Sequence, residues 1–389
     1  MIVHPKIKNN ICLNAHPKGL ELLVKKEIEY VQKQGKIAGP KNVLVIGAST
    51  GYGLASRIVA AFGSDANTIG VASGRPPTAV RTGNVGYYTM RAFDNAAREK
   101  GLIAESLTGD AFSHEIKDRV VSILKKNNMV LDCVVYSLAA SSRRDPDTGE
   151  LFRGSIKPIG RSFTSKSLDA GKEVIKEVHF EPATKEDIAG AVKVMGGEDW
   201  ELWMNRLSDE KLLTPNVLTV AYSYIGPPVT AAVYREGTLG MAKKHLEATG
   251  DKLHEKLSAK GGRAFVAVNK ALVTRSSAVI PVVPLYISAL FKVMKEKNIH
   301  EGCIEQMFRL FHEKLYKGEA VPVDELRRIR MDDWELREDV QKEIDKIWNI
   351  IDETNYRTIA DFRGYEDDFL QFHGFGFSGI DYSEDVDIT

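Results

Sequence analysis

Cysteine is scarce in this sequence, which has only Cys12, Cys133 and Cys303, far apart and without CxxC spacing. This scarcity argues against a disulfide framework and a zinc cage, and it fits a reducing, cytoplasmic setting. The nine histidines form no ligand pairs with carboxylates at helical spacing, so we expect no bound metal. Cys133 lies within an apolar run, where we expect it to be a small buried hydrophobe.

Net charge is absent too, since Lys and Arg together number 53 and Asp and Glu together also number 53. This balance removes the overall basic footprint of a nucleic-acid-binding protein, although a local basic patch could still bind an acidic ligand. No stretch reaches the ~18 consecutive apolar residues of a membrane-spanning helix. The first residues also lack the pattern of a signal peptide. We therefore expect neither nucleic acid nor membrane as a partner.

Short apolar runs alternate with helical patterns along most of the chain. The expected helices lie at 54–62 and 114–126, and the expected strands lie at 43–46, 68–72, 102–107, 131–138, 217–222 and 264–268. Continuous apolar strands between helices are typical of a parallel sheet that is covered on both faces. The sequence therefore predicts an α/β fold of the doubly wound, Rossmann type.

The remaining segments interrupt this alternation without separating into modules. We expect one elaborated domain over residues 1–389, with an N-terminal extension at 1–40, an insertion after the fourth strand at 141–215 and a helical C-terminal extension at 296–389. The apolar run 278–294 is compatible both with core packing and with a cover for an acyl chain.

Three glycines, Gly47, Gly51 and Gly53, stand between the first strand and the helix that follows it. Glycine permits a tight turn and a close approach of the backbone to a pyrophosphate, which the N-terminus of the helix then binds. The GxxxGxG spacing resembles the short-chain dehydrogenase variant of the dinucleotide-binding turn. Glycines at a strand–helix turn are weak evidence alone, but this context favours a dinucleotide site.

The end of the second strand bears on the choice of dinucleotide. An enzyme that binds NAD through its ribose hydroxyls usually has a carboxylate there, whereas this chain has Ser73, Gly74 and Arg75. The guanidinium of Arg75 is suited to a 2′-phosphate, so the segment favours NADPH over NADH. The alternative is that Arg75 is a solvated loop residue.

Two tyrosines and a lysine follow the fifth strand. Tyr234 and Lys243 are nine positions apart, so they can act together only if the helix begins after Tyr234, and Gly237 with Thr238 offers a break and a cap. A nearby ammonium would lower the pKa of the phenol and make it a better proton donor. An arbitrary tyrosine and lysine would instead be a packing residue and a solvated one.

Longer stretches resemble one family across essentially the whole chain. Tyr224, Tyr234 and GMAKKHLEA resemble the active-site stretch of short-chain-type enoyl-acyl-carrier-protein reductases. Those enzymes have six residues between tyrosine and lysine, whereas eight lie here, and the YxxxK of ketoreductases is absent. The longer interval is similar to trans-2-enoyl-CoA reductases and their carrier-protein-reducing bacterial relatives. The other matching stretches are NNICLNAHPKG, GASTGYGLASRI, GDAFS, VYSLAA, KVMGGEDW, AYSYIG, VNKALVTRSSAVIP, KVMKEKNIHEGCIEQ and MDDWELR.

The resemblance implies a role for each matching position. Tyr234 would be the proton donor, Lys243 would bind the cofactor and Tyr224 would touch the substrate. From pyrophosphate through adenosine to nicotinamide, the cofactor would contact Gly47, Ala48, Ser49, Thr50, Gly51, Tyr52, Ser73, Gly74, Asp110, Ala111, Leu138, Ala139, Leu272, Val273 and Thr274. Family members that use NADH typically have glutamate where Gly74 stands, and this departure again favours NADPH.

The expected activity is reduction of trans-2-enoyl thioesters, such as crotonyl-CoA, by NADH or NADPH in a monomeric enzyme. The charge on the thioester oxygen would be stabilised by Tyr234 as the hydride reaches the β-carbon. An enoyl-acyl-carrier-protein reductase is the nearest alternative because it shares this chemistry. A non-catalytic NAD(P)-sensing protein is the alternative of another class, and the presence of Tyr234 and Lys243 argues against it.

Overall fold

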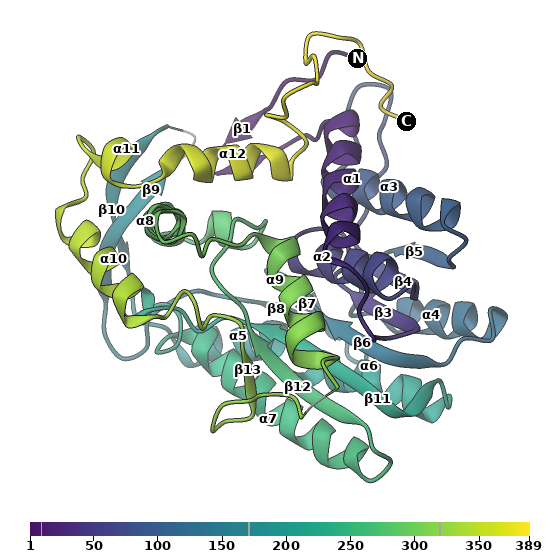
Figure 1. The fold of residues 1–389 in the computed structure, drawn as a ribbon. Coiled ribbons are helices and arrows are strands. Elements are labelled where there is room, and N and C mark those ends of the chain that lie inside the picture. The colour runs from purple at the N-terminus through teal and green to yellow at the C-terminus, as the bar shows by residue number, and fades with distance from the viewer. Residues whose placement is uncertain (9, 170–171, 319) are drawn as a thin grey trace.

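A seven-stranded parallel sheet forms the centre of the computed structural model, which describes residues 1–8, 10–169, 172–318 and 320–389 (Figure 1). Every strand pair in this sheet is parallel. In spatial order the strands are β13 (Arg328–Arg330), β12 (Arg263–Val268), β11 (Leu213–Ser223), β6 (Leu131–Tyr136), β3 (Asn42–Ile46), β4 (Asn67–Ala72) and β5 (Ala104–Thr108). This is the 3-2-1-4-5-6 order of a doubly wound fold with one strand added, and it confirms the predicted fold class.

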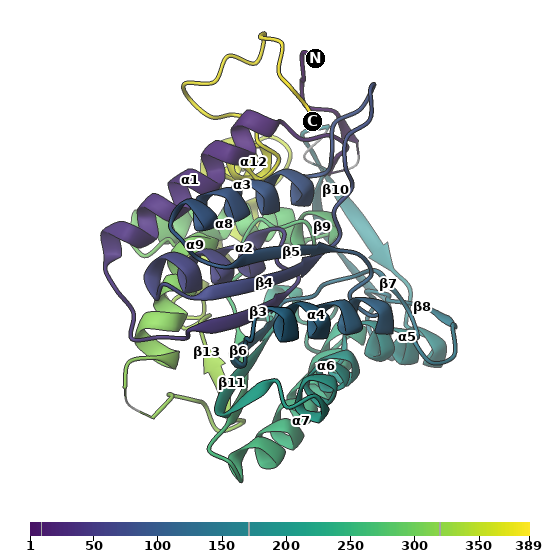
Figure 2. The same ribbon diagram turned by 90° about the vertical axis from the view of Figure 1, so that its right-hand side faces the viewer.

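Helices cover both faces of this sheet (Figure 2). Val43 and Val45 of β3 point to one face and Leu44 and Ile46 to the other, because successive strand side chains alternate. The first face is packed by α1 (Pro17–Gln34), α2 (Gly51–Ile58), its π-helical continuation η1 (Val59–Gly63), α3 (Val85–Glu99), α9 (Cys303–Arg309) and its π-helical continuation η4 (Leu310–Leu315). The second face is packed by α4 (His114–Lys126), α6 (Glu198–Asp209) and α7 (Thr238–Ser258).

The expected C-terminal extension is not purely helical. Its β13 pairs with β12 as the seventh strand, and α9 with η4 joins the core on the first face of the sheet. The expectation of a helical extension over 296–389 is therefore wrong at β13, whereas α9 and η4 are helical. β13 has a single apolar residue, Ile329, between two arginines, so it lacks the apolar run by which the other strands were identified.

The insertion over 141–215 contains two antiparallel pairs of strands. These are β7 (Ser142–Arg144) with β8 (Leu151–Arg153) and β9 (Phe163–Asp169) with β10 (Val174–Phe180). The helix α5 (Lys185–Met195) follows them and packs against both α7 and β8. Residues 170 and 171 of this insertion, like residue 9 and residue 319, lie outside the described residues.

The remaining elements form a second layer beside the carboxyl ends of the strands. The short η2 (Pro228–Thr230) and η3 (Ser277–Val279) lead into α7 and α8 respectively. α8 (Val283–Glu296) is buried between α10 (Glu338–Ile350), β9 and α12 (Phe362–Phe372). The small hairpin β1 (Ile7–Lys8) and β2 (Ile11–Cys12) and the short α11 (Tyr356–Ile359) complete this layer.

The two ends of the chain lie side by side (Figure 1). The backbone N–H of His16 donates a hydrogen bond of 2.9 Å to the carbonyl oxygen of His373. The hydroxyl of Tyr88 donates to the carbonyl oxygen of Ile388 at 2.7 Å, and the rings of His16 and Tyr382 pack edge to face. These contacts hold the N-terminal hairpin and α12 in one wall of the molecule.

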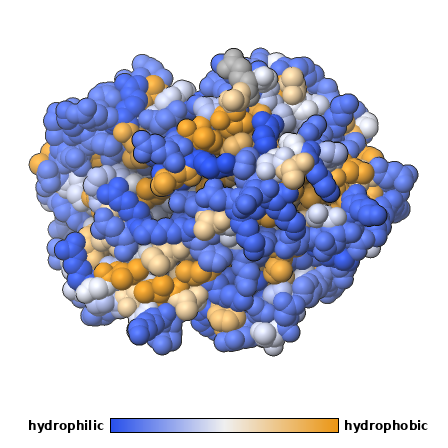
Figure 3. Space-filling model, turned by 90° about the horizontal axis from the view of Figure 1, so that it is seen from below, coloured by the Kyte–Doolittle hydropathy of each residue, from blue (hydrophilic) through white to orange (hydrophobic). Residues whose placement is uncertain are grey.

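No described helix is long and apolar enough to cross a bilayer. The face shown in Figure 3 is mostly hydrophilic, with hydrophobic residues in separate smaller areas. Scattered apolar surface of this kind is ordinary for a globular protein.

A buried arginine joins α2 to the sheet. The guanidinium of Arg57 has no exposed surface and donates hydrogen bonds to Asp94 at 3.0 Å, to Thr68 at 3.1 Å and to Ser106 at 2.7 Å. A methyl group on Gly70 would stand 2.7 Å from the same guanidinium, so glycine makes room for it. Burial lowers the pKa of Arg57 to about 10, so the group remains charged at neutral pH.

We expect the Asp94→Ala variant to be strongly destabilised, because it leaves the Arg57 guanidinium buried without its carboxylate. Breaking a buried ion pair from one side costs about 3–5 kcal/mol. The measurement is the free energy of unfolding in urea. Glu338→Ala removes an exposed ion pair with Lys342 and is the control, with an expected change below ~0.5 kcal/mol. Equal effects of the two substitutions would contradict the role of Arg57.

Candidate active site

A cavity of about 790 Å³ opens at the carboxyl ends of the parallel strands. Its lining comes from the segments that follow β3, β4, β6, β11 and β12, together with α7. The strand order reverses between β3 and β6, and ligands of doubly wound sheets bind beside such a switch point. The position of the cavity follows from the strand order.

The turn between β3 and α2 requires its glycines. A methyl group on Gly53 would lie 2.0 Å from the carbonyl oxygen of Gly47, and Gly47 and Gly51 have positive φ angles of 91° and 54°. Ser49 and Thr50 line the cavity directly before the first turn of α2. The side chain of the N-cap residue Thr50 makes no capping hydrogen bond within the described part of the chain, so the helix end offers N–H groups and a positive dipole end to an anion.

The end of β4 places an arginine at the same cavity. Arg75 is exposed and lines the cavity, and among the described residues its guanidinium has no hydrogen-bond or ion-pair partner. Its backbone N–H donates to the Asn84 side chain at 2.9 Å, which holds the loop against the start of α3. A methyl group on Gly74 would lie 2.7 Å from the hydroxyl of Thr108, so a larger residue there would have to displace that side chain.

The two tyrosines and the lysine meet at the cavity as the sequence predicted. Tyr224, Tyr234 and Lys243 all line it, and the two tyrosine rings pack edge to face with their centroids 5.0 Å apart. α7 begins at Thr238, after a break at Gly237, so the expected break is confirmed.

The hydroxyl of Thr238 does not cap α7. It donates to the carbonyl oxygen of Ser155 at 2.6 Å and accepts the N–H of Lys157 at 3.1 Å. The expectation that it caps the helix is therefore wrong. Instead, these two hydrogen bonds join the insertion to the start of α7.

Burial dominates the electrostatics of the site. The pKa of Tyr234 is raised above its ordinary value by burial and, secondarily, by the negative charge of Glu335. The pKa of Lys243 is lowered to about 8 by burial, which Glu247 partly opposes. Our expectation that an ammonium lowers the pKa of the tyrosine is therefore wrong in this structure. Tyr234 holds its proton firmly, so it acts as a hydrogen-bond donor at neutral pH.

The other residues that the resemblance implied fall into two groups. Ser49, Thr50, Ser73, Leu138, Ala139, Val273 and Thr274 line the cavity with Arg75. The lining does not include Gly47, Ala48, Gly51, Tyr52, Gly74, Asp110, Ala111 and Leu272. The Tyr52 hydroxyl donates to the carbonyl oxygen of Lys270, and the Asp110 carboxylate accepts the N–H of Phe112 at 3.0 Å. Both side chains therefore have structural partners in this state.

Part of the lining was missed by the sequence analysis. Some of it comes from segments between the strands of the main sheet, such as 84–86 and 140–142, and some comes from both ends of the chain, namely Asn10, Ile11, Cys12, Leu13, Asn14, Phe369, Phe372 and His373. The apolar run 278–294 divides: Ala278, Val279 and Ile280 line the cavity, whereas α8 is core. The aromatic residues in 369–373 were a visible signal, but their place depends on packing between distant segments.

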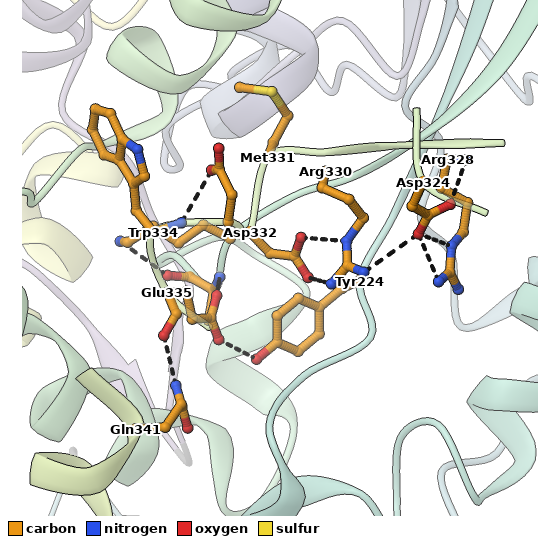
Figure 4. A network of polar contacts seen from close by, with 12 residues as sticks. Tyr224, Asp324, Arg328, Arg330, Met331, Asp332, Trp334, Glu335 and Gln341 are labelled. Carbon is orange, nitrogen blue, oxygen red and sulfur yellow. Dashed lines mark hydrogen bonds and ion pairs between the residues drawn. The ribbon is translucent and has the colours of Figure 1, made fainter. Parts of the chain in front are cut away.

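Glu335, also missed, lies beside Tyr224 and is joined to its hydroxyl by a hydrogen bond (Figure 4). It follows β13, has no exposed surface and accepts the hydroxyl of Tyr224 at 3.0 Å. Its own backbone carbonyl accepts the side-chain amide of Gln341 at 2.7 Å. Nearby, Arg330 forms an ion pair with Asp332 at 2.7 Å. The carboxylate therefore belongs to an ordered polar network, and it reaches the cavity through Tyr224.

Three family models match this chain along most of its length. The one described as the catalytic region of trans-2-enoyl-CoA reductase matches residues 81–316. The one described as the NAD(P)H binding domain of trans-2-enoyl-CoA reductase matches residues 2–79, and the one described as an enoyl reductase FAD binding domain matches residues 323–386.

Individual relatives agree with these models over the full chain. An enoyl-[acyl-carrier-protein] reductase [NADH] of Flavobacterium johnsoniae is 52% identical, covering 99% of this chain and 98% of its own. A trans-2-enoyl-CoA reductase [NADH] of Ruminiclostridium cellulolyticum is also 52% identical, covering 100% and 98%. The crystal structure of Treponema denticola trans-2-enoyl-CoA reductase with NAD has a TM-score of 0.96 at 51% identity, covering 99% and 98%. On this evidence the chain belongs to the trans-2-enoyl-CoA reductase family.

Proposed function

We propose that this protein reduces the carbon–carbon double bond of trans-2-enoyl thioesters, with short-chain enoyl-CoA such as crotonyl-CoA as substrate. The proposal rests on one observation: Tyr224, Tyr234 and Lys243 line the same cavity as the start of α2. Relatives named trans-2-enoyl-CoA reductase [NADH] and enoyl-[acyl-carrier-protein] reductase [NADH] support it. A protein that only senses the nucleotide would not need two tyrosines in such a cavity.

The residues of the β3–α2 turn fit a dinucleotide. Gly47 and Gly53 allow close backbone approach, and Ser49 and Thr50 would hold the pyrophosphate at the uncapped end of α2. Lys243, which lines the cavity, would hold the ribose next to the nicotinamide. When bound, NAD(P)H supplies the hydride for the β-carbon of the substrate.

The tyrosines act on the thioester carbonyl. Negative charge develops on its oxygen as the β-carbon is reduced, and a donor aimed at that oxygen stabilises the charge where it forms. Tyr234 suits this role because its raised pKa keeps the hydroxyl protonated. Its burial also excludes water, which would weaken the hydrogen bond. The ring of Tyr224 contacts the ring of Tyr234, and Tyr224 positions the same thioester carbonyl.

The family model that matches residues 323–386 is described as an FAD binding domain, but these residues do not fit a flavin site. The structure describes all of them, and they form β13 and the helices α10 to α12 without a strand–glycine–helix phosphate turn. They contribute only Phe369, Phe372 and His373 to the cavity, and none of these is a phosphate-binding cation at neutral pH, since the pKa of His373 is lowered by burial. We therefore derive no step through a flavin.

The direct test measures initial rates with crotonyl-CoA and with crotonyl groups on acyl carrier protein, each with NADH and NADPH. We expect reduction of crotonyl-CoA. Activity with the carrier-protein thioester alone would instead favour the role in fatty-acid synthesis. Nucleotide binding without either activity would favour the sensor.

We expect Tyr234→Phe to lower kcat for crotonyl-CoA reduction by about 100- to 1,000-fold, the usual loss for one oxyanion donor. Affinity for the reduced cofactor, measured by fluorescence, should stay within about twofold. Tyr30→Phe is the matched control, because Tyr30 packs against the core away from the cavity. Unchanged kcat in the Tyr234 variant would remove this tyrosine from the mechanism.

We also propose that Arg75 allows this chain to use NADPH, although its relatives are named for NADH. Its guanidinium has no partner among the residues that the structure describes, and a charge-assisted bond to a 2′-phosphate contributes about 1.5–3 kcal/mol. Arg75→Ala should therefore raise KM for NADPH by about tenfold or more and leave KM for NADH unchanged. Arg81→Ala, at an exposed arginine outside the cavity, is the control. Equal changes for the two cofactors would contradict the proposal.

A further inference from the structure

A single buried carboxylate holds three segments around the cavity. Oε1 of Glu335 accepts the hydroxyls of Tyr224 at 3.0 Å and Tyr286 at 2.8 Å, and Oε2 accepts the N–H of Ala271 at 2.7 Å. These partners come from the end of β11, from α8 and from the loop after β12. Glu335 itself does not line the cavity. Of its three partners, only Tyr224 lines the cavity.

The direction of the hydrogen bond between Tyr224 and Glu335 has a chemical consequence. A phenol has one proton, so a Tyr224 hydroxyl that donates to the carboxylate offers only lone pairs to the cavity. A protonated Glu335 could donate to the same oxygen, and the proton of Tyr224 could then turn toward the substrate. The ring of Tyr224 stays in contact with Tyr234 in either case, since neither ring has to move.

We propose that Glu335 is a positioning residue for thioester reduction: through its hydrogen bond with Tyr224 it determines whether that hydroxyl donates to the substrate carbonyl. This inference rests on the proposed function, since it assigns Tyr224 as a second donor to the thioester oxygen.

The surroundings of Glu335 allow its carboxylate to gain and lose a proton near physiological pH. Burial raises the pKa of its carboxyl to about 7, and the hydrogen bonds from Ala271 and Tyr286 and the positive charge of Lys270 partly oppose this rise. Burial also lowers the pKa of Lys270 itself to about 8. The titratable groups that interact with the carboxyl come from every element around it: Tyr224 directly after β11, Tyr234 before α7, Lys270 from the loop after β12, Tyr286 from α8, Asp332 from the segment after β13 and Tyr52 from α2.

The sign of the pH effect follows from this arrangement. Below pH 7 Glu335 carries a proton and Tyr224 is free to donate, so kcat is at its plateau. As pH rises through 7, Glu335 loses its proton and its carboxylate again accepts a hydrogen bond from the Tyr224 hydroxyl. The hydroxyl then no longer donates to the substrate, and kcat falls. A group with a pKa of about 7 gives a fall of about tenfold between pH 6 and pH 8. Lys243, with its pKa lowered to about 8, adds about a twofold fall over the same range.

The test compares pH profiles of kcat for crotonyl-CoA reduction in the wild type and in Glu335→Gln. The glutamine amide keeps the shape of the side chain and donates from one end at every pH, so Tyr224 stays free. We expect the combined fall of about twentyfold in the wild type to shrink to about twofold, which is the remaining effect of Lys243. A profile of unchanged shape at lower activity would show a merely structural role and overturn the proposal.

Two further variants separate this role from damage to the fold. Tyr286→Phe removes one donor to the same oxygen, away from the cavity, and so should raise the pKa of Glu335 and move the midpoint of the profile to higher pH. An unmoved midpoint would overturn the proposal even if Glu335→Gln does not fold. In a Tyr224→Phe background, Glu335→Gln should change the profile no further, and a persistent effect would also overturn it.

The proposed function and this inference fail in distinguishable ways. Absence of wild-type reduction of crotonyl-CoA at every pH would sink the proposed function. Wild-type reduction with a profile that Glu335→Gln does not alter would sink only the role of Glu335.

Discussion

The common direction of all seven strands is the constraint on which the site depends. Because every strand of the main sheet ends at the same edge, the segments that follow β3, β4, β6, β11, β12 and β13 all meet there. The glycine turn, Arg75, Tyr224 and Glu335 are far apart in sequence and follow four different strands. In an antiparallel meander consecutive strands end at opposite edges, so Arg75 would lie away from the glycine turn. The chemistry of the site is therefore a product of topology as much as of residue type.

The local pattern of apolar residues was sufficient to predict most of the fold. Most of the six strands that were predicted are apolar runs, and such runs are typical of strands buried on both faces of a sheet. β13 could not be found in this way, because an Arg-Ile-Arg segment is a strand only through its pairing with β12. The N-terminal hairpin and α12 share a wall for a similar reason: contacts such as that of His16 with the backbone of His373 join segments with no local relation.

Some features of the site could be predicted from local sequence, whereas its electrostatics could not. The break at Gly237 was readable from the chain, and it brings Tyr234 and Lys243 to one cavity. The direction in which the pKa of Tyr234 shifts could not be predicted from the sequence. Burial outweighs any effect of the Lys243 ammonium, and the distance between the two groups is set by the fold. Glu335 was one acid among several in MDDWELR, and only its burial against Tyr224 distinguishes it.

The wall that joins the two ends of the chain has a consequence for synthesis. Residues 10–14 and 369–373 line one cavity but are separated by more than 350 residues of chain. A nascent polypeptide can assemble β3 to β6 and their helices while translation continues, since domains fold from the N-terminus as they emerge from the ribosome. It cannot close the cavity until α12 has been made. The apolar lining of the cavity is thus exposed until late in translation. Until then the ribosome-bound chain has the parallel sheet and its helices but lacks one wall of the cavity.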